Sequence, residues 1–469
     1  MKTTYQYKFS PDTNQKLELN NWLRICRFWY NRQLGDRFDW WEMNRVSVNA
    51  CPLVSSIAQL REKPNYYSQK KQLPILKKDL VKVFHSGELL DFSRVDSTVL
   101  QDVSKRVDKA FERFIIGDSK GNKAGKPRFK SESSFKTMTF ANAKNSWIQL
   151  IRKNWLYLRL PKLGIIKVRR HRPIPSGFVI KQISVTKKAD GWFIQLVLED
   201  SRVPEFTPDE IIPTWENSMG IDAVLQDNIY LATSEGEKLP SLKPLRKNQD
   251  KLDRLSRKRN ARKRGSRRRR KLAKCEAKQH QKIARSRQDF QYKTAHKLVR
   301  SGKKVFFHED LNLKGLTKRN KAKQDETGTA VALLGETPRP HCFKFLPNGQ
   351  SAKSGLNKSW LDAAFGNFFK TLDYIAEKAG AVVIPQKPAY SSQVLSYRNE
   401  IIFTDCNIRE YWDEQNSLMV DRDVNAAINL KRLGLGIFPS IKRRSGNLVI
   451  VGTMSDSTTK EILNTLIGL

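Results

Sequence analysis

"MGIDAVLQDNIYLATSEG", residues 219–236, decides the fold of the C-terminal half of the chain. Two short apolar runs flank a polar turn, which predicts a pair of strands with Asp222 at the end of the first. Further along, "KKVFFHEDLNLKG" (303–315) predicts a buried strand that ends at Glu309, and "AVVIPQ" (381–386) predicts another. These patterns indicate a mixed α/β unit with carboxylates at the ends of its strands.

A further pair of acids stands in "LMVDRDVNAAINL" (418–430), where Asp421 and Asp423 flank an arginine before a predicted helix. Taken alone, either acid is an ordinary N-cap residue. Asp222, Glu309 and Asp423 together favour another interpretation, because a βαβ sheet gathers functional side chains at strand ends and helix starts. Clustered carboxylates can hold two divalent cations for phosphodiester hydrolysis, and Mg²⁺ or Mn²⁺ prefers such oxygen ligands.

The composition indicates a polyanionic partner. Lys and Arg number 87 against 47 Asp and Glu, a formal net charge of +40, and nucleic acid binds such proteins through the release of counterions. Charge alone does not separate an enzyme from a structural RNA-binding protein. The N-terminus lacks a signal peptide's apolar segment, and no run is long enough to span a membrane. We therefore expect a soluble, intracellular protein that is not associated with membranes.

The densest positive charge lies in residues 251–274, "KLDRLSRKRNARKRGSRRRRKLAK", which hold fourteen Lys and Arg and one acid. Helical spacing on both sides of Gly265-Ser266 predicts a helical hairpin with a basic face that contacts nucleic acid. A second basic segment, "GDSKGNKAGKPRFKS" (117–131), is a loop that either contacts phosphates or is merely solvated. The candidate nucleic-acid-binding residues are Lys126, Arg128, Lys130, Arg257, Lys258, Arg259, Arg267, Arg268, Arg269 and Arg270.

The N-terminal half predicts two kinds of structure. Helical spacing in "STVLQDVSKRVDKAFERFI" (97–115) and in the aromatic-rich stretch after Pro11 predicts packing helices. From 135 to 200 the residues alternate as in strands, which predicts a small basic β-barrel or sandwich that a strand at residues 3–9 joins.

In order along the chain, eight segments resemble the TnpB family, whose members are encoded by insertion sequences and are related to the type V CRISPR effectors: "YKFSPDTNQ", "CRFWYN", "RVDKAFERF", "GKPRFKS", "RLPKLGIIKVRRHRPIP", "MGIDAVL", "HEDLNLKGL" and "DRDVNAAINL". The resemblance implies an α/β multidomain protein that cuts DNA at sites chosen by pairing with a guide RNA. It implies guide RNA and double-stranded target DNA as partners, and a location in the prokaryotic cytoplasm in association with the nucleoid. Asp222, Glu309 and Asp423 match the family's catalytic acids and would bind the metal ions. Asp421 then shapes the start of the helix or contacts the metal ligands without binding the metal itself.

The same resemblance implies a domain plan. Residues 1–10 and 126–215 correspond to a wedge β-barrel, and residues 11–125 to an inserted helical recognition domain. Residues 216–391 and 420–445 correspond to a RuvC-like nuclease domain of RNase H-like fold, with the basic hairpin at 246–300 and an inserted loop at 318–355. Residues 392–419 correspond to a degenerate zinc ribbon, and residues 446–469 to a C-terminal tail.

The chain departs from the family pattern in two places. The four positions that usually carry zinc-binding cysteines hold Leu395, Arg398, Asp413 and Asn416. Because structural zinc needs four N or S ligands and Cys406 stands alone, we expect no zinc. Apolar packing should hold this segment instead, through Ile401, Ile402, Phe403, Tyr411 and Trp412.

The second departure is Val224, which replaces a common glycine two residues after the first Asp and leaves less room for close backbone approach. An RNA-guided DNA-binding protein or repressor with weak or no cleavage is therefore the alternative function. A transposase is a weaker one, because no HxH pair accompanies a tyrosine nucleophile in this sequence.

Overall fold

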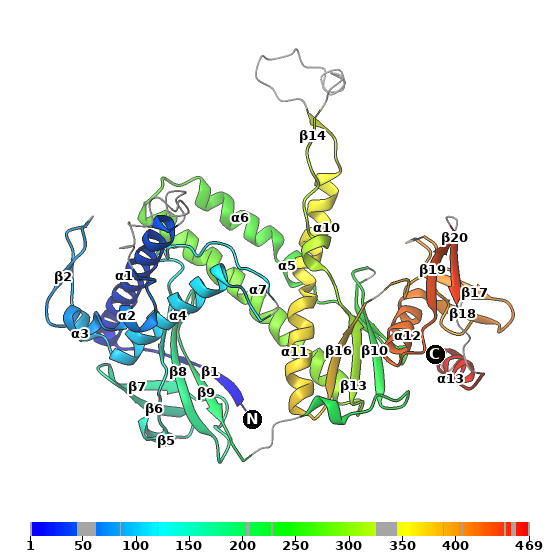
Figure 1. Ribbon diagram of the computed structural model, residues 1–469, viewed down its shortest axis with the longest axis horizontal. Helices are drawn as coiled ribbons and strands as arrows, with labels where there is room; N and C mark the ends of the chain where they lie inside the picture. Colours follow the sequence, from blue (N-terminus) through cyan, green and yellow to red (C-terminus); the bar gives the residue numbers. More distant parts are fainter. Residues whose placement is uncertain are drawn as a thin grey trace, which may run out of the picture. The chain divides into compact units, whose positions relative to one another are not determined.

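The computed structural model describes residues 2–44, 62–84, 86–119, 121–202, 207–226, 228–324, 345–387, 389–398, 400–405, 407–444, 447–451 and 456–467. The chain divides into two compact units, residues 1–205 and 206–469 (Figure 1). No described helix combines the length and the apolar composition that a bilayer crossing requires.

The first unit contains a seven-stranded antiparallel sheet in the order β4-β8-β9-β1-β7-β6-β5. Alternate residues of β1 are buried, including Tyr5, Tyr7 and Phe9, so one face of the sheet supports the core. The prediction that the N-terminal strand joins the later strands is confirmed, because β1 pairs with both β9 and β7. The strands are β1 Lys2–Phe9, β4 Thr137–Phe140, β5 Ile148–Arg152, β6 Trp155–Leu160, β7 Gly164–Arg169, β8 Val179–Lys188 and β9 Gly191–Glu199.

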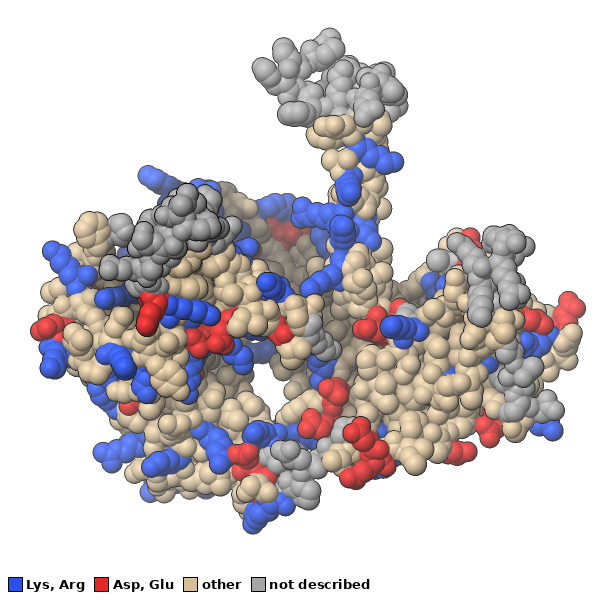
Figure 2. All heavy atoms as spheres, viewed as in Figure 1, with Lys and Arg blue, Asp and Glu red and all other residues tan. Residues whose placement is uncertain are grey.

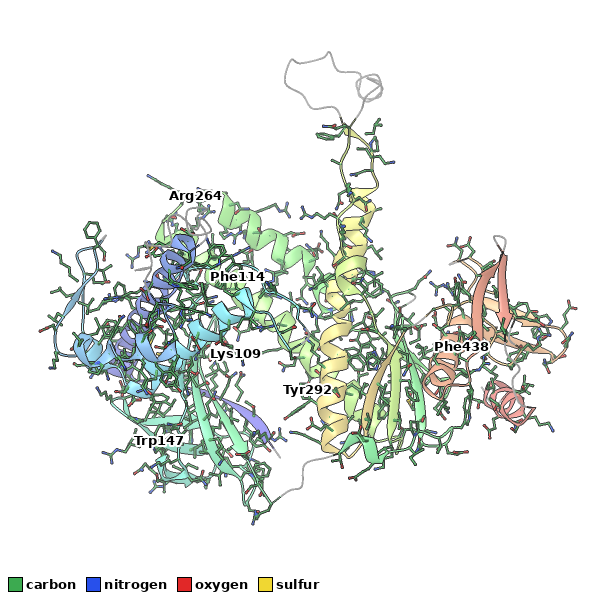
Figure 3. The ribbon with its side chains drawn as sticks, viewed as in Figure 1. Lys109, Phe114, Trp147, Arg264, Tyr292 and Phe438 are labelled. Atoms are coloured by element: carbon green, nitrogen blue, oxygen red, sulfur yellow. The ribbon has the colours of Figure 1, made fainter. Side chains whose placement is uncertain are left out.

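Helices α1 (Thr13–Met43) and α4 (Ser97–Ile115) pack against this sheet. Asp12 caps α1 in a capping box with Gln15. The two helices meet through aromatic side chains such as Trp41 and Phe114, whose ring centroids lie 5.1 Å apart. Phe114 is labelled on α4 in Figure 3. The shorter elements of this unit are α2 Tyr66–Lys70, α3 Leu73–Leu76, β2 Val81–Lys82 and β3 Leu89–Leu90.

The second unit is built on a five-stranded mixed sheet in the order β12-β11-β10-β13-β16. Strands β10 (Ser218–Ala223), β13 (Val305–Glu309) and β16 (Val382–Gln386) are parallel, whereas β11 (Ile229–Thr233) and β12 (Lys238–Pro240) are antiparallel to their neighbours. The predicted end of a buried strand at Glu309 is confirmed. Helices α7 (Arg267–Val299) and α11 (Phe365–Lys378) cover the face that carries Ile221 and Phe306.

The opposite face of the sheet lies against helix α12 (Arg422–Gly434). A glycine allows the backbones of the sheet and the helix to approach closely. A Cβ built at Gly220 would lie 1.9 Å from the carbonyl oxygen of Ala427, so the backbones of β10 and α12 touch. Gly434 plays the same part for Phe307 of β13, whose ring would lie 2.2 Å from an added Cβ. Because side chains alternate along a strand, Asp222 shares the α12 face with Gly220, and Glu309 shares it with Phe307.

The predicted basic hairpin is confirmed as α6 (Gln249–Asn260) followed by α7, with a left-handed Gly265 (φ 81°) in the turn. The buried carboxylate of Asp362, in α10 (Gln350–Ala363), ties the hairpin to its neighbours. It accepts hydrogen bonds from the N–H groups of Leu245 and Arg246 in α5 (Pro244–Lys247) and pairs with Arg287 of α7 at 2.8 Å.

The predicted loop at 318–355 needs a correction. Helix α10 begins at Gln350, and β14 (Lys323–Gln324) pairs with β15 (Phe345–Leu346) in a short antiparallel ladder beyond α8 (Leu313–Leu316). Residues 325–344 lie outside the described residues. The prediction of an irregular insertion was wrong at its C-terminal end, because residues 350–355 belong to the first turns of a helix.

The end of the chain is more structured than the tail predicted for 446–469. Strand β20 (Asn447–Val451) pairs with β19 (Ser440–Arg444), and α13 (Asp456–Ile467) buries Ile462 and Leu466 beside Val424 and Ile428 of α12. Two more strands, β17 (Glu410–Asp413) and β18 (Leu418–Asp421), form an antiparallel ladder that leads directly into α12.

Candidate active site

Asp222 and Glu309 lie at the same edge of the five-stranded sheet. Strands β10 and β13 run parallel, with Ile221 opposite His308, so the next residue of each strand is one of the two acids. Both side chains belong to the face that α12 covers. The sequence predicted acids at two strand ends, and the pairing explains why they become neighbours.

Asp423 enters from the first turn of α12, and the residue two positions before it holds that turn in place. Asp421 is the N-cap, and its Oδ1 accepts hydrogen bonds from the N–H groups of Asp423 (3.0 Å) and Val424 (3.1 Å). Lys238 pairs with the other oxygen of Asp421. The predicted role of Asp421 at the helix start is therefore confirmed, and Lys238 was not foreseen.

Each of the three acids has a raised pKa, and the other two contribute to the shift at Asp222. Burial, followed by the charges of Asp423 and Glu309, raises the pKa of Asp222 to about 7. Burial and the neighbouring Asp310 raise the pKa of Glu309, and burial and Asp421 raise the pKa of Asp423. Crowded carboxylates with raised pKa values are a donor set that a divalent cation would stabilise.

Sequence reasoning did not foresee that Arg409 contacts one of these three acids. The guanidinium of Arg409 lies 3.1 Å from Oδ1 of Asp423. Within the described parts of the chain, no three His, Cys, Asp or Glu side chains converge closely enough to hold a metal ion. The acids thus share a neighbourhood and an electrostatic field, and an arginine pairs directly with Asp423.

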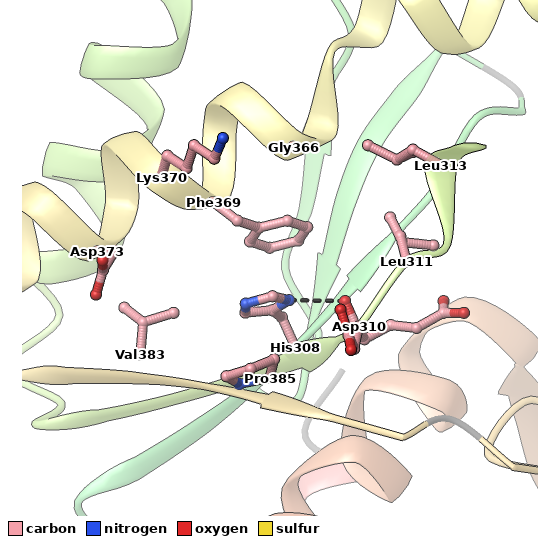
Figure 4. A pocket seen from close by; sticks show the side chains of 11 residues that line it. His308, Asp310, Leu311, Leu313, Gly366, Phe369, Lys370, Asp373, Val383 and Pro385 are labelled. Carbon is pink, nitrogen blue, oxygen red and sulfur yellow. Dashed lines mark hydrogen bonds between the residues drawn. The ribbon is translucent and has the colours of Figure 1, made fainter. Parts of the chain in front are cut away.

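On the other face of the sheet, a pocket of about 320 Å³ lies beside the end of β13 (Figure 4). The His308 ring stacks on Phe369 with centroids 3.8 Å apart, and Nδ1 of His308 donates to the carbonyl oxygen of Glu309 at 2.7 Å. Burial lowers the pKa of His308. A neutral imidazole with its proton on Nδ1 therefore fixes the backbone that carries Glu309.

The four positions of the predicted degenerate ribbon hold a polar cluster and an apolar residue. Asp413 is buried, pairs with Arg398 at 3.1 Å and accepts hydrogen bonds from Tyr397 (2.6 Å) and Asn416 (2.7 Å). Leu395 is buried in a hydrophobic cluster with side chains of α12 and α13. The predicted apolar packing is confirmed for Phe403, Ile402 and Tyr411.

The prediction of apolar packing was wrong for Trp412, which is 51% exposed on the opposite face of β17. Sequence reasoning also missed the ion pair between Arg398 and Asp413. Cys406 lies outside the described residues. At the second departure from the family pattern, Val224 is buried and its backbone φ is not positive, so this position does not require glycine.

The candidate nucleic-acid-binding residues divide into two groups. Arg257, Lys258, Arg267, Arg268 and Arg270 are exposed along α6 and the start of α7, on a molecule with many exposed Lys and Arg side chains (Figure 2). By contrast, Arg269 donates to the carbonyl oxygen of Arg262 at 2.8 Å and to that of Arg259 at 3.3 Å, which satisfies the end of α6. Arg259 pairs with Glu276 at 2.8 Å.

In the loop at 117–131, the three candidates also differ. The ammonium of Lys126 lies 3.0 Å from Glu42 and 4.5 Å from the centroid of the Phe38 ring. The backbone N–H of Lys130 donates to Asn31 at 2.7 Å, whereas Arg128 is exposed. Lys126 and Lys130 therefore help to attach the loop to α1, and Arg128 is the candidate best placed to meet a phosphate.

Comparisons with known proteins match most of the chain. A family described as "Probable transposase" matches residues 205–320, a "Helix-turn-helix domain" family matches residues 1–45, and the "Cas12f1-like, TNB domain" family matches residues 365–430. Within residues 2–44 the structure has one strand and one helix.

Two curated relatives are each named "Putative RNA-guided DNA endonuclease". The protein from Streptomyces pristinaespiralis is 26% identical over 444 residues, which cover 93% of this chain and 90% of the relative. InsQ from Escherichia coli (strain K12) is 25% identical over 402 residues, which cover 85% and 84%. A solved Cas12f1–sgRNA–target DNA complex aligns at 10% identity and a TM-score of 0.47, over 89% of this chain and 82% of that chain.

The fold and its carboxylates define an α/β protein with an acidic site at the ends of the parallel strands of a mixed sheet. The family matches and the two relatives support the TnpB family as the one that this chain resembles.

Proposed function

We propose that this chain is an RNA-guided, divalent-metal-dependent DNA endonuclease encoded by a transposable element. The observation that carries the proposal is the placement of Asp222 and Glu309 at the ends of two paired parallel strands, with Asp423 in the first turn of α12. Burial, followed by the charges of Asp423 and Glu309, raises the pKa of Asp222 there to about 7. Mutually repelling carboxylates persist in a fold mostly where function requires them. The names of both curated relatives support the same activity.

The nuclease domain in this proposal is RuvC-like, within the second unit. Its support is the strand order β12-β11-β10-β13-β16, in which the antiparallel strands β12 and β11 lie on one side of β10 and the parallel strands β13 and β16 on the other. Asp222 and Glu309 lie at the same end of β10 and β13. The wedge domain corresponds to the seven-stranded sheet of the first unit.

Asp222, Glu309 and Asp423 would hold Mg²⁺ or Mn²⁺, because their oxygens suit hard cations. When bound, such ions supply an activated water and stabilise the leaving oxygen of the phosphodiester. The chain's own residues arrange the ligands: Asp421 orients the first turn of α12, and His308 fixes the backbone of Glu309. Guide RNA would select the double-stranded target by pairing, and exposed arginines of the hairpin would contact phosphates.

One observation favours the alternative function, an RNA-guided DNA-binding protein that cuts weakly or not at all. Arg409 pairs with Asp423 and opposes a cation at that oxygen. The alternative keeps the same partners and the same basic surface, so only a cleavage assay separates the two functions.

The test uses the full chain with its copurified RNA, sequenced to define the guide. Asp222→Ala, Glu309→Ala and Asp423→Ala should each abolish cleavage of matched DNA with Mg²⁺, while binding in EDTA stays near the wild-type level, since each removes a cation ligand. Asp421→Ala should lose less activity, and Asp289→Ala, an exposed acid of α7, serves as the matched control. Cleavage by the Asp222, Glu309 or Asp423 variant removes that residue from the set, and no cleavage by wild type favours the alternative.

A further inference from the structure

Helices α10 and α11 are separated by a single residue, Ala364, in the left-handed conformation (φ 52°, ψ 45°). The sequence at the break is Ala363-Ala364-Phe365. Alanine is the strongest helix former, and a side chain in the left-handed region is strained, so local preference favours one continuous helix. The nearby Gly366 is helical and does not supply the break. Contacts from elsewhere in the fold must therefore hold it.

Two side chains replace backbone donors that a continuous helix would use. In such a helix, the carbonyl oxygens of Asp362 and Ala363 would accept hydrogen bonds from the N–H groups four residues later. Here Nε of Arg287 donates to the carbonyl oxygen of Asp362 at 2.8 Å. The hydroxyl of Tyr230 donates to that of Ala363 at 3.1 Å. The break therefore leaves neither carbonyl without a donor.

A third donor and a ring contact secure the other side of the break. Nε2 of Gln291 donates to the carbonyl oxygen of Ala364 at 3.1 Å. Phe365, the first residue of α11, stacks on Tyr230 with centroids 5.0 Å and planes 19° apart. Tyr230 comes from β11, whereas Arg287 and Gln291 come from α7. The sheet and the long helix of the hairpin thus hold the break together.

The helices on either side of the break belong to different parts of the second unit. The β14–β15 ladder leads into α10, and α11 packs on the five-stranded sheet (Figure 1). Phe369 of α11 stacks on His308, whose Nδ1 donates to the carbonyl oxygen of Glu309 (Figure 4). A change at the break would therefore move α10 relative to the sheet, and α11 would carry it to the backbone of Glu309.

We propose that residues 350–378 have two states, the broken state described here and a continuous helix in which Ala364 is right-handed. Tyr230, Arg287 and Gln291 select the broken state. Both states provide donors for the carbonyl oxygens of Asp362 and Ala363, so the balance depends on the strain at Ala364 and on the three side chains. The break is then a joint that sets the direction of α10. This inference goes beyond the proposed endonuclease function and does not depend on it.

Two glycine variants test the conformation of the break. Ala364→Gly should raise the Tm by roughly 2–4 °C, because glycine adopts a positive φ without strain. Ala363→Gly is the matched control and should lower the Tm by a similar amount, since this residue belongs to the last turn of α10. Calorimetry on the full chain in EDTA measures both values. A lower Tm for both variants means that Ala364 is right-handed in solution and overturns the proposal.

Spin labels at the exposed positions Lys358 and Glu377 detect the second state by double electron–electron resonance. Attachment through a ketone-bearing amino acid leaves the native cysteines unlabelled. In a continuous helix the two Cα atoms lie about 28 Å apart, and any bend shortens this distance. Wild type should therefore give one shorter distance. Tyr230→Phe combined with Gln291→Met removes two donors and keeps the side-chain volume, and a second distance near the longer value should appear.

A rescue and a control complete the experiment. Adding Ala364→Gly to the double variant should restore the single wild-type distance, because glycine removes the strain of the broken state. Tyr374→Phe removes a phenolic hydroxyl from the C-terminal half of α11, where it contacts Lys378, and should leave the distance unchanged. Circular dichroism shows that each variant is folded. A single, unchanged distance in the folded double variant overturns the proposal, and no metal or nucleic acid is present, so the outcome is independent of cleavage.

Discussion

Arg409 and Asp423 form an ion pair 3.1 Å long, and the backbone carbonyl of the same arginine accepts a hydrogen bond from the N–H of Arg422. The start of α12 therefore contacts both the backbone and the side chain of Arg409. A divalent cation that uses this oxygen of Asp423 must displace the guanidinium. Arg409 thus acts as a competitor for the site.

Arg409→Ala should raise the affinity for Mn²⁺, because the cation no longer displaces an ion pair. A partly exposed pair is worth up to ~1 kcal/mol, which corresponds to roughly a fivefold lower Kd. Isothermal titration calorimetry on the full chain measures this change, and Arg409→Lys, which keeps the charge, should fall between the two. Equal or weaker Mn²⁺ binding by Arg409→Ala would show that the arginine does not compete.

Asp222→Asn should stabilise the metal-free protein at pH 8. The folded state raises the pKa of Asp222 to about 7 from an ordinary value of 3.8. Between these values the folded state binds more protons than the unfolded state, so stability falls as pH rises from about 4 to 7. The asparagine variant does not lose this stability, because its side chain does not ionise. Its gain in Tm should be largest above pH 7 and shrink towards pH 4, as measured by calorimetry in EDTA, and a pH-independent difference would contradict the assignment.

Gly220→Ala should destabilise the second unit and disturb the site. An added Cβ would overlap the carbonyl oxygen of Ala427, and overpacking of this kind costs ~1–3 kcal/mol or more. Gly355 is the matched control, because it lies within α10 and a Cβ there meets nothing within 4 Å. Gly355→Ala should be neutral or stabilising by up to ~1 kcal/mol. Urea denaturation compares the two, and equal stabilities would refute close contact between β10 and α12.

The segment that precedes α12 should depend on Asp413 and not on zinc. Burial tends to raise the pKa of Asp413, but hydrogen bonds from Asn416 and Tyr397 and the charge of Arg398 hold it below its ordinary value. Asp413→Ala removes the buried member of the pair with Arg398, whose other carboxylate neighbour, Glu400, lies further away at 3.7 Å. Loss of one member of a buried pair costs roughly 3–5 kcal/mol. Denaturation should show this loss, whereas EDTA leaves wild type unchanged and metal analysis finds no stoichiometric zinc. One zinc per chain would overturn the prediction.

Replacing Arg267, Arg268 and Arg270 by Ala should weaken binding to matched and mismatched DNA about equally, because phosphates carry no sequence information. The slope of log K against log salt should fall by ~0.7–0.9 for each phosphate that the variant no longer neutralises. Arg269 is left in place, since it satisfies the carbonyl oxygens at the end of α6, and Arg269→Ala should lower helix stability instead. An unchanged slope in the folded triple variant means that the three arginines are merely solvated.

Local patterns were sufficient to predict the strand that ends at Glu309, the strand that carries Asp222 and the basic hairpin. Each has a periodicity and a boundary signal within a few residues. The contact between Arg409 and Asp423 could not be predicted in this way, because it depends on how β17 pairs with β18. Gly220 did leave a signal, since an isolated glycine in an apolar strand indicates close backbone approach.

The orientation of Trp412 shows another limit. Tyr411, Trp412 and Asp413 are consecutive, and two adjacent aromatic residues give no alternation from which to choose the buried one. The choice follows from Asp413, whose carboxylate is buried with Arg398, and from the register that places Tyr411 opposite Val420. A shift of one residue would exchange the two faces.

The short ladder of β14 and β15 has a practical consequence for anyone who builds variants of this protein. Its register places Gln324 opposite Phe345, so the chain leaves and returns at adjacent backbone positions. Closing such a gap requires only a two-residue turn, for example Asn-Gly. We therefore expect that a variant with this turn in place of residues 325–344, or with a fluorescent or affinity module whose termini are close together, keeps the pairing of β14 with β15.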